Sequence, residues 1–105
     1  MKYVRLKKQT DFDKLFQKGK RAFSPSLTML YTKSKQTTMG ISVGKRHGKS
    51  VVRNRIKRLL REAFRAELPK MKHAYAIVLI PKVAEKYDYH LFRQHIAKMI
   101  EKDAL

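Results

Sequence analysis

The chain has 105 residues, a formal net charge of +18 and a sequence pI near 10.5, and it contains no cysteine. This length allows one domain with one modest core, so we predict a single domain over residues 1–105, and the absence of cysteine excludes disulfides and thiolate metal sites. The charge favours a polyanionic partner, and without an apolar run of about 18 residues or a secretory signal we expect a cytoplasmic protein with no membrane partner.

The first third of the chain predicts one helix and two strands. A short helix is expected from Asp11 to about Lys18, because Thr10 and Asp13 resemble the capping box that opens helices. Two runs rich in β-branched and apolar residues then predict strands at Leu27–Lys33 and Thr37–Lys45. In the second strand the bulky residues alternate with Gly40, Ser42 and Gly44, which predicts one face on the core and one nearly bare face.

The rest of the chain predicts a long helix, a strand and a final helix. The long helix is expected over about Val51–Glu67, where Leu68 and Pro69 end it. Ala74–Ile80 is an almost unbroken apolar run, which is typical of a central strand covered on both faces. Asp88 is expected to cap a last helix that ends near Glu101.

The long helix carries the strongest functional signal. At about 100° per residue, its apolar residues fall in one stripe and its basic residues cover the opposite side. Along one edge the residues at successive i+4 positions are all cationic, with no acid interleaved: Arg53, Lys57, Arg61 and Arg65. Like charges at this spacing repel by a few tenths of a kcal/mol per pair. Such a row therefore favours a nucleic-acid backbone, whose neutralised phosphates release counterions, over a merely solvated face.

Signatures of catalysis by side chains are weak. Gly40–Gly44 matches the G-x-S-x-G nucleophile elbow, but the alternation runs through Ser42 without the sharp turn that this motif requires. The eight acids suggest no catalytic pair, and the four histidines have neither i+4 partners nor acids at metal-ligand spacing: His47, His73, His90 and His95. We therefore expect no catalytic residue, metal site or cofactor on the protein.

Three aromatic residues have two possible roles. Phe12 and Phe16 lie four residues apart on the first predicted helix, and Tyr31 lies near the end of a predicted strand. The three rings could pack in the core. They could equally form a stacking platform for unpaired RNA bases, each worth ~1–3 kcal/mol. The residues alone leave these two interpretations equally weighted.

The motifs resemble the signature of the bacterial ribonuclease P protein subunit. The resemblance is carried by Gly40–Val43, Lys45–Gly48 and Val51–Phe64, the last containing Arg53-Asn54-Arg55. It extends back through Asp11–Gly19 and forward through Ala74–Pro81 and the last helix, and so covers nearly the whole chain. A small departure is Ser50, where the family usually has alanine.

The resemblance implies a fold. The family is α+β, a single-domain α/β sandwich in the order helix, strands, long helix, strand, helix, similar to the second domain of ribosomal protein S5. It also implies a left-handed β-α-β crossover around the long helix. The general rule for such crossovers predicts the opposite hand in ~98% of cases.

The resemblance also implies a function. The family's protein pairs with a catalytic RNA subunit, binds the 5′ leader of precursor tRNA, broadens substrate specificity and assists endonucleolytic removal of the leader. Hydrolysis is performed by the RNA with bound Mg²⁺, and no obligate protein partner is implied. The residues implied to bind the RNA subunit are Lys45, Arg46, Lys49, Arg53, Asn54, Arg55, Lys57, Arg58 and Arg61. Those implied to bind the leader are Phe12, Phe16, Tyr31 and, from the bare strand face, Ser42.

Two other classes fit the composition. One is a basic ribosomal RNA-binding protein, and the other is a DNA-binding helix, in which Asn54 and the arginines would read base edges. The RNA or DNA that copurifies with the protein discriminates among the three.

Overall fold

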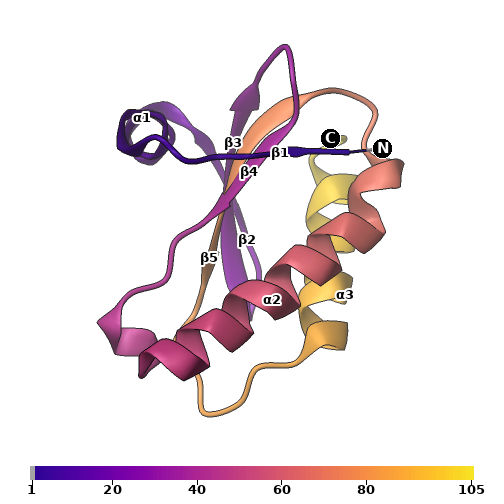
Figure 1. Ribbon diagram of the computed structural model, residues 1–105. Coiled ribbons are helices and arrows are strands. Elements are labelled where there is room, and N and C mark those ends of the chain that lie inside the picture. Colours follow the sequence, from indigo (N-terminus) through magenta and orange to yellow (C-terminus); the bar gives the residue numbers. More distant parts are fainter. Residues whose placement is uncertain (1) are drawn as a thin grey trace.

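The structure is a computed structural model that describes residues 2–105 as one five-stranded sheet with helices on both faces (Figure 1). The strands are β1 (Val4–Arg5), β2 (Lys20–Phe23), β3 (Leu27–Lys33), β4 (Thr38–Ile41) and β5 (Tyr75–Pro81). The helices are α1 (Gln9–Lys18), α2 (Ser50–Glu67) and α3 (Tyr89–Lys102), with short 3₁₀ turns η1 (Lys45–His47) and η2 (Leu68–Lys70). The predicted mixed α+β sandwich is confirmed.

The strand order is β1-β4-β5-β3-β2, with β5 at the centre. β5 pairs in parallel with β4 and antiparallel with β3. Its side chains alternate between the two faces, because Ile77 and Leu79 enter the larger core while Val78 enters the smaller one. The continuous apolar run at this position therefore marks a strand that is covered twice, as predicted.

The connection from β4 through α2 to β5 is left-handed. In Figure 1 both strands run downward on one side of the molecule and α2 returns upward on the other. β1 lies nearest the viewer, so the strand order places β5 behind β4. A connection that turns anticlockwise as it moves away from the viewer is left-handed. This is the rare hand for a β-α-β crossover between parallel strands. The resemblance implied this hand correctly, and the general rule did not.

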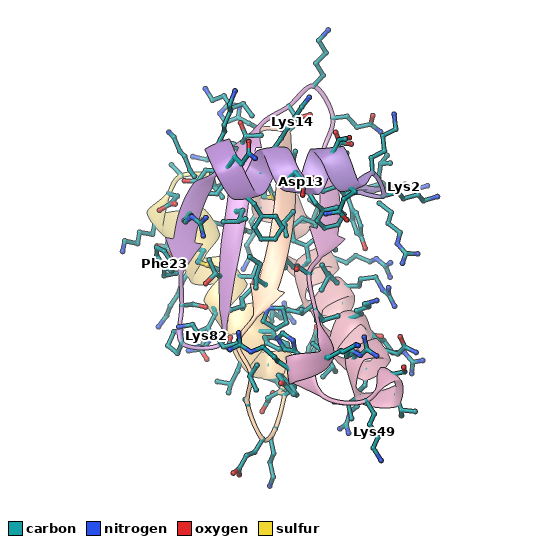
Figure 2. The ribbon with its side chains drawn as sticks, turned by 90° about the vertical axis from the view of Figure 1, so that its left-hand side faces the viewer. Lys2, Asp13, Lys14, Phe23, Lys49 and Lys82 are labelled. Carbon is teal, nitrogen blue, oxygen red and sulfur yellow. The ribbon has the colours of Figure 1, made fainter. Side chains whose placement is uncertain are left out.

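Two hydrophobic clusters of unequal size hold the sheet. The larger lies between the sheet and the pair α2 and α3, and includes the fully buried rings of Phe64 and Phe92. The smaller lies under α1 and consists of Leu6, Leu15, Leu30 and Val78. Figure 2 shows α1 crossing in front of one end of the sheet only. In the part of the chain that the structure describes, no α-helix covers the rest of that sheet face.

Some helix ends match the expectation and others do not. Asp88 caps α3, because its carboxylate accepts from the N–H groups of His90 and Leu91 at 2.7 and 3.4 Å. The capping box predicted at Thr10 is wrong, because α1 begins at Gln9 and Thr10 lies inside it. Asp13 is used differently: its carboxylate accepts from the Gln9 side chain at 3.0 Å.

The strands differ from the expectation at the sheet margins. β1 and β2 were not predicted, because β1 is only two residues long and β2 buries a single side chain, that of Ala22. The strand predicted to reach Lys45 ends at Ile41. The N–H of Ser42 still donates to the carbonyl of Leu79 at 2.9 Å, after which the chain turns into η1.

Candidate nucleic-acid interface

α2 buries its apolar stripe from Ile56 onward and presents its basic residues outward, as the periodicity predicted. Val52, which was predicted to begin the stripe, is exposed. Ile56, Leu60, Ala63 and Phe64 are buried against the sheet and α3. The predicted RNA-binding residues on the helix are exposed or half-buried: Arg53, Asn54, Arg55, Lys57, Arg58 and Arg61. The row at i+4 spacing therefore lies along the flank of the helix, where a long anion can reach it.

These cations have no acidic partners among residues 2–105. Both ion pairs in this range use one carboxylate, that of Glu67, which lies 3.1 Å from the Lys70 ammonium and 3.6 Å from the Arg93 Nε. Arg53 donates to the Ser50 hydroxyl at 3.1 Å, a neutral partner. The positive field of the α2 flank is therefore left available to an external polyanion.

The loop before α2 is held in place by His47. Its Nδ1 accepts from the N–H of Gly44 at 3.1 Å, and its Nε2 donates to the carbonyl of Pro81 at 2.7 Å. Both bonds fit the tautomer that carries its proton on Nε2. Gly48 follows with φ +116, a conformation that favours glycine. The loop thereby presents its predicted RNA-binding cations to solvent: Lys45, Arg46 and Lys49.

The role of His47 was missed at the sequence level. A single histidine between basic residues gave no sign that its ring would bridge the loop and the end of β5. The hydrogen bond spans 34 positions in sequence, so only the folded topology reveals it.

A pocket of about 140 Å³ joins the α2 flank to α1. Lys57 and Arg61 line it from α2, and Arg5 lines it from the edge strand β1. Phe12 of α1 and Gly40 of β4 complete its inner wall. Three cations and two aromatic residues, Tyr3 and Phe12, therefore line one hollow. The sequence analysis had assigned Lys57 and Arg61 to one surface and Phe12 to another.

Phe12 covers part of the strand face that was expected to be bare. The ring is half-buried and packs on the smaller core. A Cβ placed on Gly40 would lie 2.5 Å from the Phe12 Cζ, so the ring rests directly on this glycine. The expected open floor is therefore wrong at Gly40. It is open farther on, because a Cβ on Gly44 would meet no atom within 4 Å, and Ser42 between them is half-buried.

Phe16 is the more accessible aromatic residue of α1. Its side chain is 37% exposed, and its carbonyl accepts from the Arg21 guanidinium at 3.1 Å. Arg21 belongs to β2, so this bond ties the end of α1 to the sheet margin. An exposed aromatic ring on a basic protein can stack on unpaired bases.

Tyr31 lies on the other face of the sheet. It pairs with Ile77 of β5 and is only 8% exposed within the larger core. Its ring packs edge-on against that of Tyr75, with 5.7 Å between the ring centroids. Its hydroxyl donates to Asp103 at 2.6 Å. Burial, followed by this carboxylate, raises the pKa of Tyr31 to about 12. The prediction that Tyr31 shares a surface with Phe12 and Phe16 is therefore wrong.

The sequence contained a signal for the correct placement of Tyr31. Leu27 and Met29, which are fully buried in the larger core, share its phase in the strand alternation. Leu30, with the opposite phase, enters the smaller core under α1. Because a shift of one residue moves a side chain to the other face of a sheet, the strand phase of Leu27 and Met29 indicates that Tyr31 faces the larger core.

A large exposed aromatic residue was also missed. Phe23 ends β2 and is 69% exposed, and Figure 2 labels it at the margin of the sheet. Because β2 was not predicted, nothing in the sequence placed Phe23 near the other aromatics. Its neighbour Ala22 is buried in the larger core, which leaves Phe23 turned away from that core.

The surface offers cations and aromatic rings rather than metal ligands. Over residues 2–105, no three His, Cys, Asp or Glu side chains come together as a metal site would need. No helix in the same range is long and apolar enough to span a membrane. Guanidinium and ammonium groups contact phosphates, and exposed rings stack on unpaired bases, so the arrangement suits single-stranded or irregular RNA.

Comparison with known proteins gives one consistent result. The family model described as Ribonuclease P matches residues 1–103. The ribonuclease P protein component of Caldanaerobacter subterraneus is 36% identical, with 99% of this chain and 92% of the relative aligned. That of Clostridium kluyveri is 36% identical, with 100% of this chain and 98% of the relative aligned.

Similarity in structure agrees with similarity in sequence. The ribonuclease P protein of Thermotoga maritima superposes with a TM-score of 0.81 at 28% identity, covering 93% of this chain and 96% of that one. This likeness includes the sheet and all three helices, since nearly the full length of each chain is covered. The chain therefore belongs to the family of bacterial ribonuclease P protein components.

Proposed function

We propose that this chain binds the catalytic RNA of ribonuclease P through α2 and its preceding loop, and the 5′ leader of precursor tRNA through α1. Membership of the family implies a role in an endonuclease holoenzyme and partnership with the ribonuclease P RNA. The observation that carries the finer proposal is the pocket in which Lys57 and Arg61 of α2 meet Phe12 of α1. The RNA subunit bound along α2 and the leader bound along α1 would lie next to each other at this pocket.

The contacts of α2 with the RNA subunit would be mainly electrostatic. Arg55 and Arg58 are exposed and have no ion-pair partner among residues 2–105, so each can neutralise one phosphate. Asn54 is also exposed but uncharged, and an amide hydrogen-bonds to phosphate, sugar or base edges. This division gives affinity to the arginines and orientation to the asparagine.

The leader would lie along the exposed side of α1. Phe16 offers the accessible ring, while Phe12 is held between the smaller core and Gly40 and forms the wall of the pocket. Ser42 lies two residues beyond Gly40, just past the end of β4. Tyr31 is not part of this proposal, because it is buried on the opposite face.

Leader removal would be performed by the RNA, with Mg²⁺ bound to the RNA rather than to the protein. In this arrangement the side chains of the protein bind and orient RNA strands and supply no nucleophile or base. Holding the leader as well as the tRNA body adds contacts that do not depend on the body. Such contacts would broaden the range of precursors that the holoenzyme accepts.

The proposal is tested by asking which nucleic acid the protein selects. The tagged protein should retain a single RNA species of ribonuclease P type from a bacterial lysate, and this RNA should process precursor tRNA faster with the protein than without it. Recovery of ribosomes would favour the ribosomal alternative, and recovery of DNA would favour a DNA-binding helix. Either of those results would contradict the proposal.

A further inference from the structure

A second hollow lies at the β2 margin of the sheet, away from the surfaces described above. It has a volume of about 220 Å³ and lies between the end of β2 and α3. Phe23 lines it from β2, and Lys98 and Lys102 line it from α3. We call this hollow the edge pocket. In Figure 2 Phe23 stands at the outer margin of the sheet, with no ribbon in front of it.

The edge pocket combines an aromatic ring with uncompensated charge. Lys98 and Lys102 are exposed and one helical turn apart, and neither is in an ion pair within residues 2–105. The two acids adjacent to Lys102 are engaged or directed elsewhere. Asp103 accepts from the Tyr31 hydroxyl at 2.6 Å, and Glu101 lines a different pocket.

The remaining walls of the edge pocket are neutral. The Nδ1 atom of His95 and the hydroxyl of Ser26 share a hydrogen bond of 2.6 Å. This bond fixes the histidine ring against the β2–β3 turn. Burial and the charge of Lys98 lower the pKa of His95. Pro25 and Met99 add apolar surface. Phe23 forms the β2 rim of this hollow, whose charge comes from the two lysines alone.

Arg21 connects the edge pocket to α1. It lies two residues before Phe23 on β2, a step of about 6.8 Å along an extended strand. Its guanidinium donates to the backbone carbonyl of Phe16 at 3.1 Å, so it links β2 to the end of α1. Phe16, Arg21 and Phe23 therefore lie on neighbouring parts of the sheet margin. Aromatic rings and guanidinium groups can both stack on bases.

We propose that the edge pocket binds an unpaired RNA nucleotide, with its base against Phe23 and its phosphate between Lys98 and Lys102. The proposal rests on the proposed function, because it assumes that single-stranded RNA reaches α1. The connection through Arg21 points to the precursor leader as the source. The RNA subunit is the other possible source of the same chemistry. A protein partner is not favoured, because the accessible ring is flanked by two unpaired cations rather than by a broad apolar surface.

The test uses the reconstituted holoenzyme and measures binding of mature tRNA and of precursors with short and long leaders. One variant is Phe23→Ala, with Leu91→Ala as its control, because Leu91 is also a large exposed apolar residue, at 47%, and does not line the edge pocket. The second variant is the pair Lys98→Ala and Lys102→Ala. Its control is the pair Lys33→Ala and Lys35→Ala, which removes the same charge from an exposed segment elsewhere.

We expect Phe23→Ala to weaken binding of the long-leader precursor by about five- to 150-fold, the range of one base stack. Phe23→Tyr should retain the affinity, because the ring is preserved. The lysine pair should lower the slope of log affinity against log salt by roughly 0.7 for each lost phosphate contact. Mature tRNA should bind all variants equally. Melting temperatures should match the controls, because the substituted side chains are exposed.

Each outcome decides the proposal. A loss confined to leader-bearing precursors supports the pocket with the leader as source, and a loss in assembly with the RNA subunit supports it with the RNA subunit as source. Variants that match their controls in every arm overturn the edge pocket while leaving the proposed function intact. A wild-type protein that neither assembles with the RNA nor distinguishes precursor from mature tRNA overturns both.

Discussion

The basic flank of α2 and the aromatic surface on the α1 side differ in how they are built. The flank is assembled from residues 53–65 of one helix, and helical periodicity alone brings its cations into a row. The aromatic surface draws on α1, β4 and β2, so it exists only when strands from distant parts of the sequence pair in the correct register. A charged surface can therefore be specified locally, whereas a stacking surface here depends on the whole fold.

The two surfaces should also differ in how they respond to salt. Phosphate contacts gain their free energy largely from counterion release, which high salt suppresses. The stacking of a base on an aromatic ring does not itself release counterions. Measurements at several salt concentrations can therefore separate the contribution of α2 from that of α1.

The largest effect is expected from removing three arginines of α2 together. In the variant Arg55→Ala, Arg58→Ala and Arg61→Ala, the slope of log affinity for the RNA subunit against log salt should fall by roughly 0.7–0.9 for each lost contact. Filter binding between low and moderate salt measures this slope.

The matched control for the arginine variant removes three cations outside the interface: Lys33, Lys35 and Lys72. It should leave the slope close to that of the wild-type protein, because only phosphates in contact contribute fully. If both variants change the slope equally, the α2 flank is acting only through net charge.

A second prediction concerns the protein without RNA. The chain carries +18 on 105 residues, and within residues 2–105 the α2 flank makes no ion pair, so we expect sulfate to bind the folded protein and stabilise it. At a hundredfold excess over Kd the free energy of unfolding should rise by about 2.7 kcal/mol. Thermal melts in sulfate and in chloride at equal ionic strength test this. Equal midpoints would reduce the effect to general screening.

The third prediction separates the two rings of α1. Phe16→Ala should weaken binding of leader-bearing precursor by roughly 1–3 kcal/mol and leave mature tRNA and RNA assembly unchanged. The melting temperature should change little, because Phe16 is exposed. Phe12→Ala should lower both leader binding and stability, since Phe12 packs on the smaller core and Gly40. Severe unfolding of Phe16→Ala without any effect on leader discrimination would return Phe16 to the core.

The features that could be predicted from the sequence are those fixed by local pattern. The apolar stripe of α2, the double burial of β5 and the Asp88 cap each depend on residues within one element, and all three are confirmed. The hand of the β4–α2–β5 crossover is different. No local pattern encodes it, and the general rule for such crossovers gives the wrong answer, so only resemblance to a known family supplied it.

The features that were missed depend on pairing between elements. β2 has one buried side chain and is recognisable only beside β3, so Phe23 could not be placed before the register was known. The bond from His47 to Pro81 joins a loop to a distant strand end. Tyr31 shows the remaining case, because its strand was predicted correctly and only the choice of face was wrong. That choice could have been made from the phase of Leu27 and Met29.

The smallest effect is expected at His95, where charge acts on the fold rather than on RNA. Burial, and then the nearby Lys98, lowers the pKa of His95 below its usual 6.5. The folded protein therefore binds this proton more weakly than the unfolded chain does. The contribution of His95 to the free energy of unfolding is therefore fully present above the pKa of the unfolded chain, 6.5. It is lost as the pH falls below 6.5 and through the lower pKa of the folded protein.

Urea unfolding at pH 7.5 and at pH 5 measures this loss in the wild-type protein and in His95→Gln. Glutamine can still hydrogen-bond to the Ser26 hydroxyl but does not titrate, so the variant should lose less stability on acidification than the wild-type protein. The wild-type protein and the variant differ at His95 alone, so the comparison isolates the contribution of this residue. Lys98→Ala should also reduce the loss, because the repulsive charge is removed. Identical pH dependence in all three proteins would show that His95 does not couple to folding, and that the lysines of α3 act only outward.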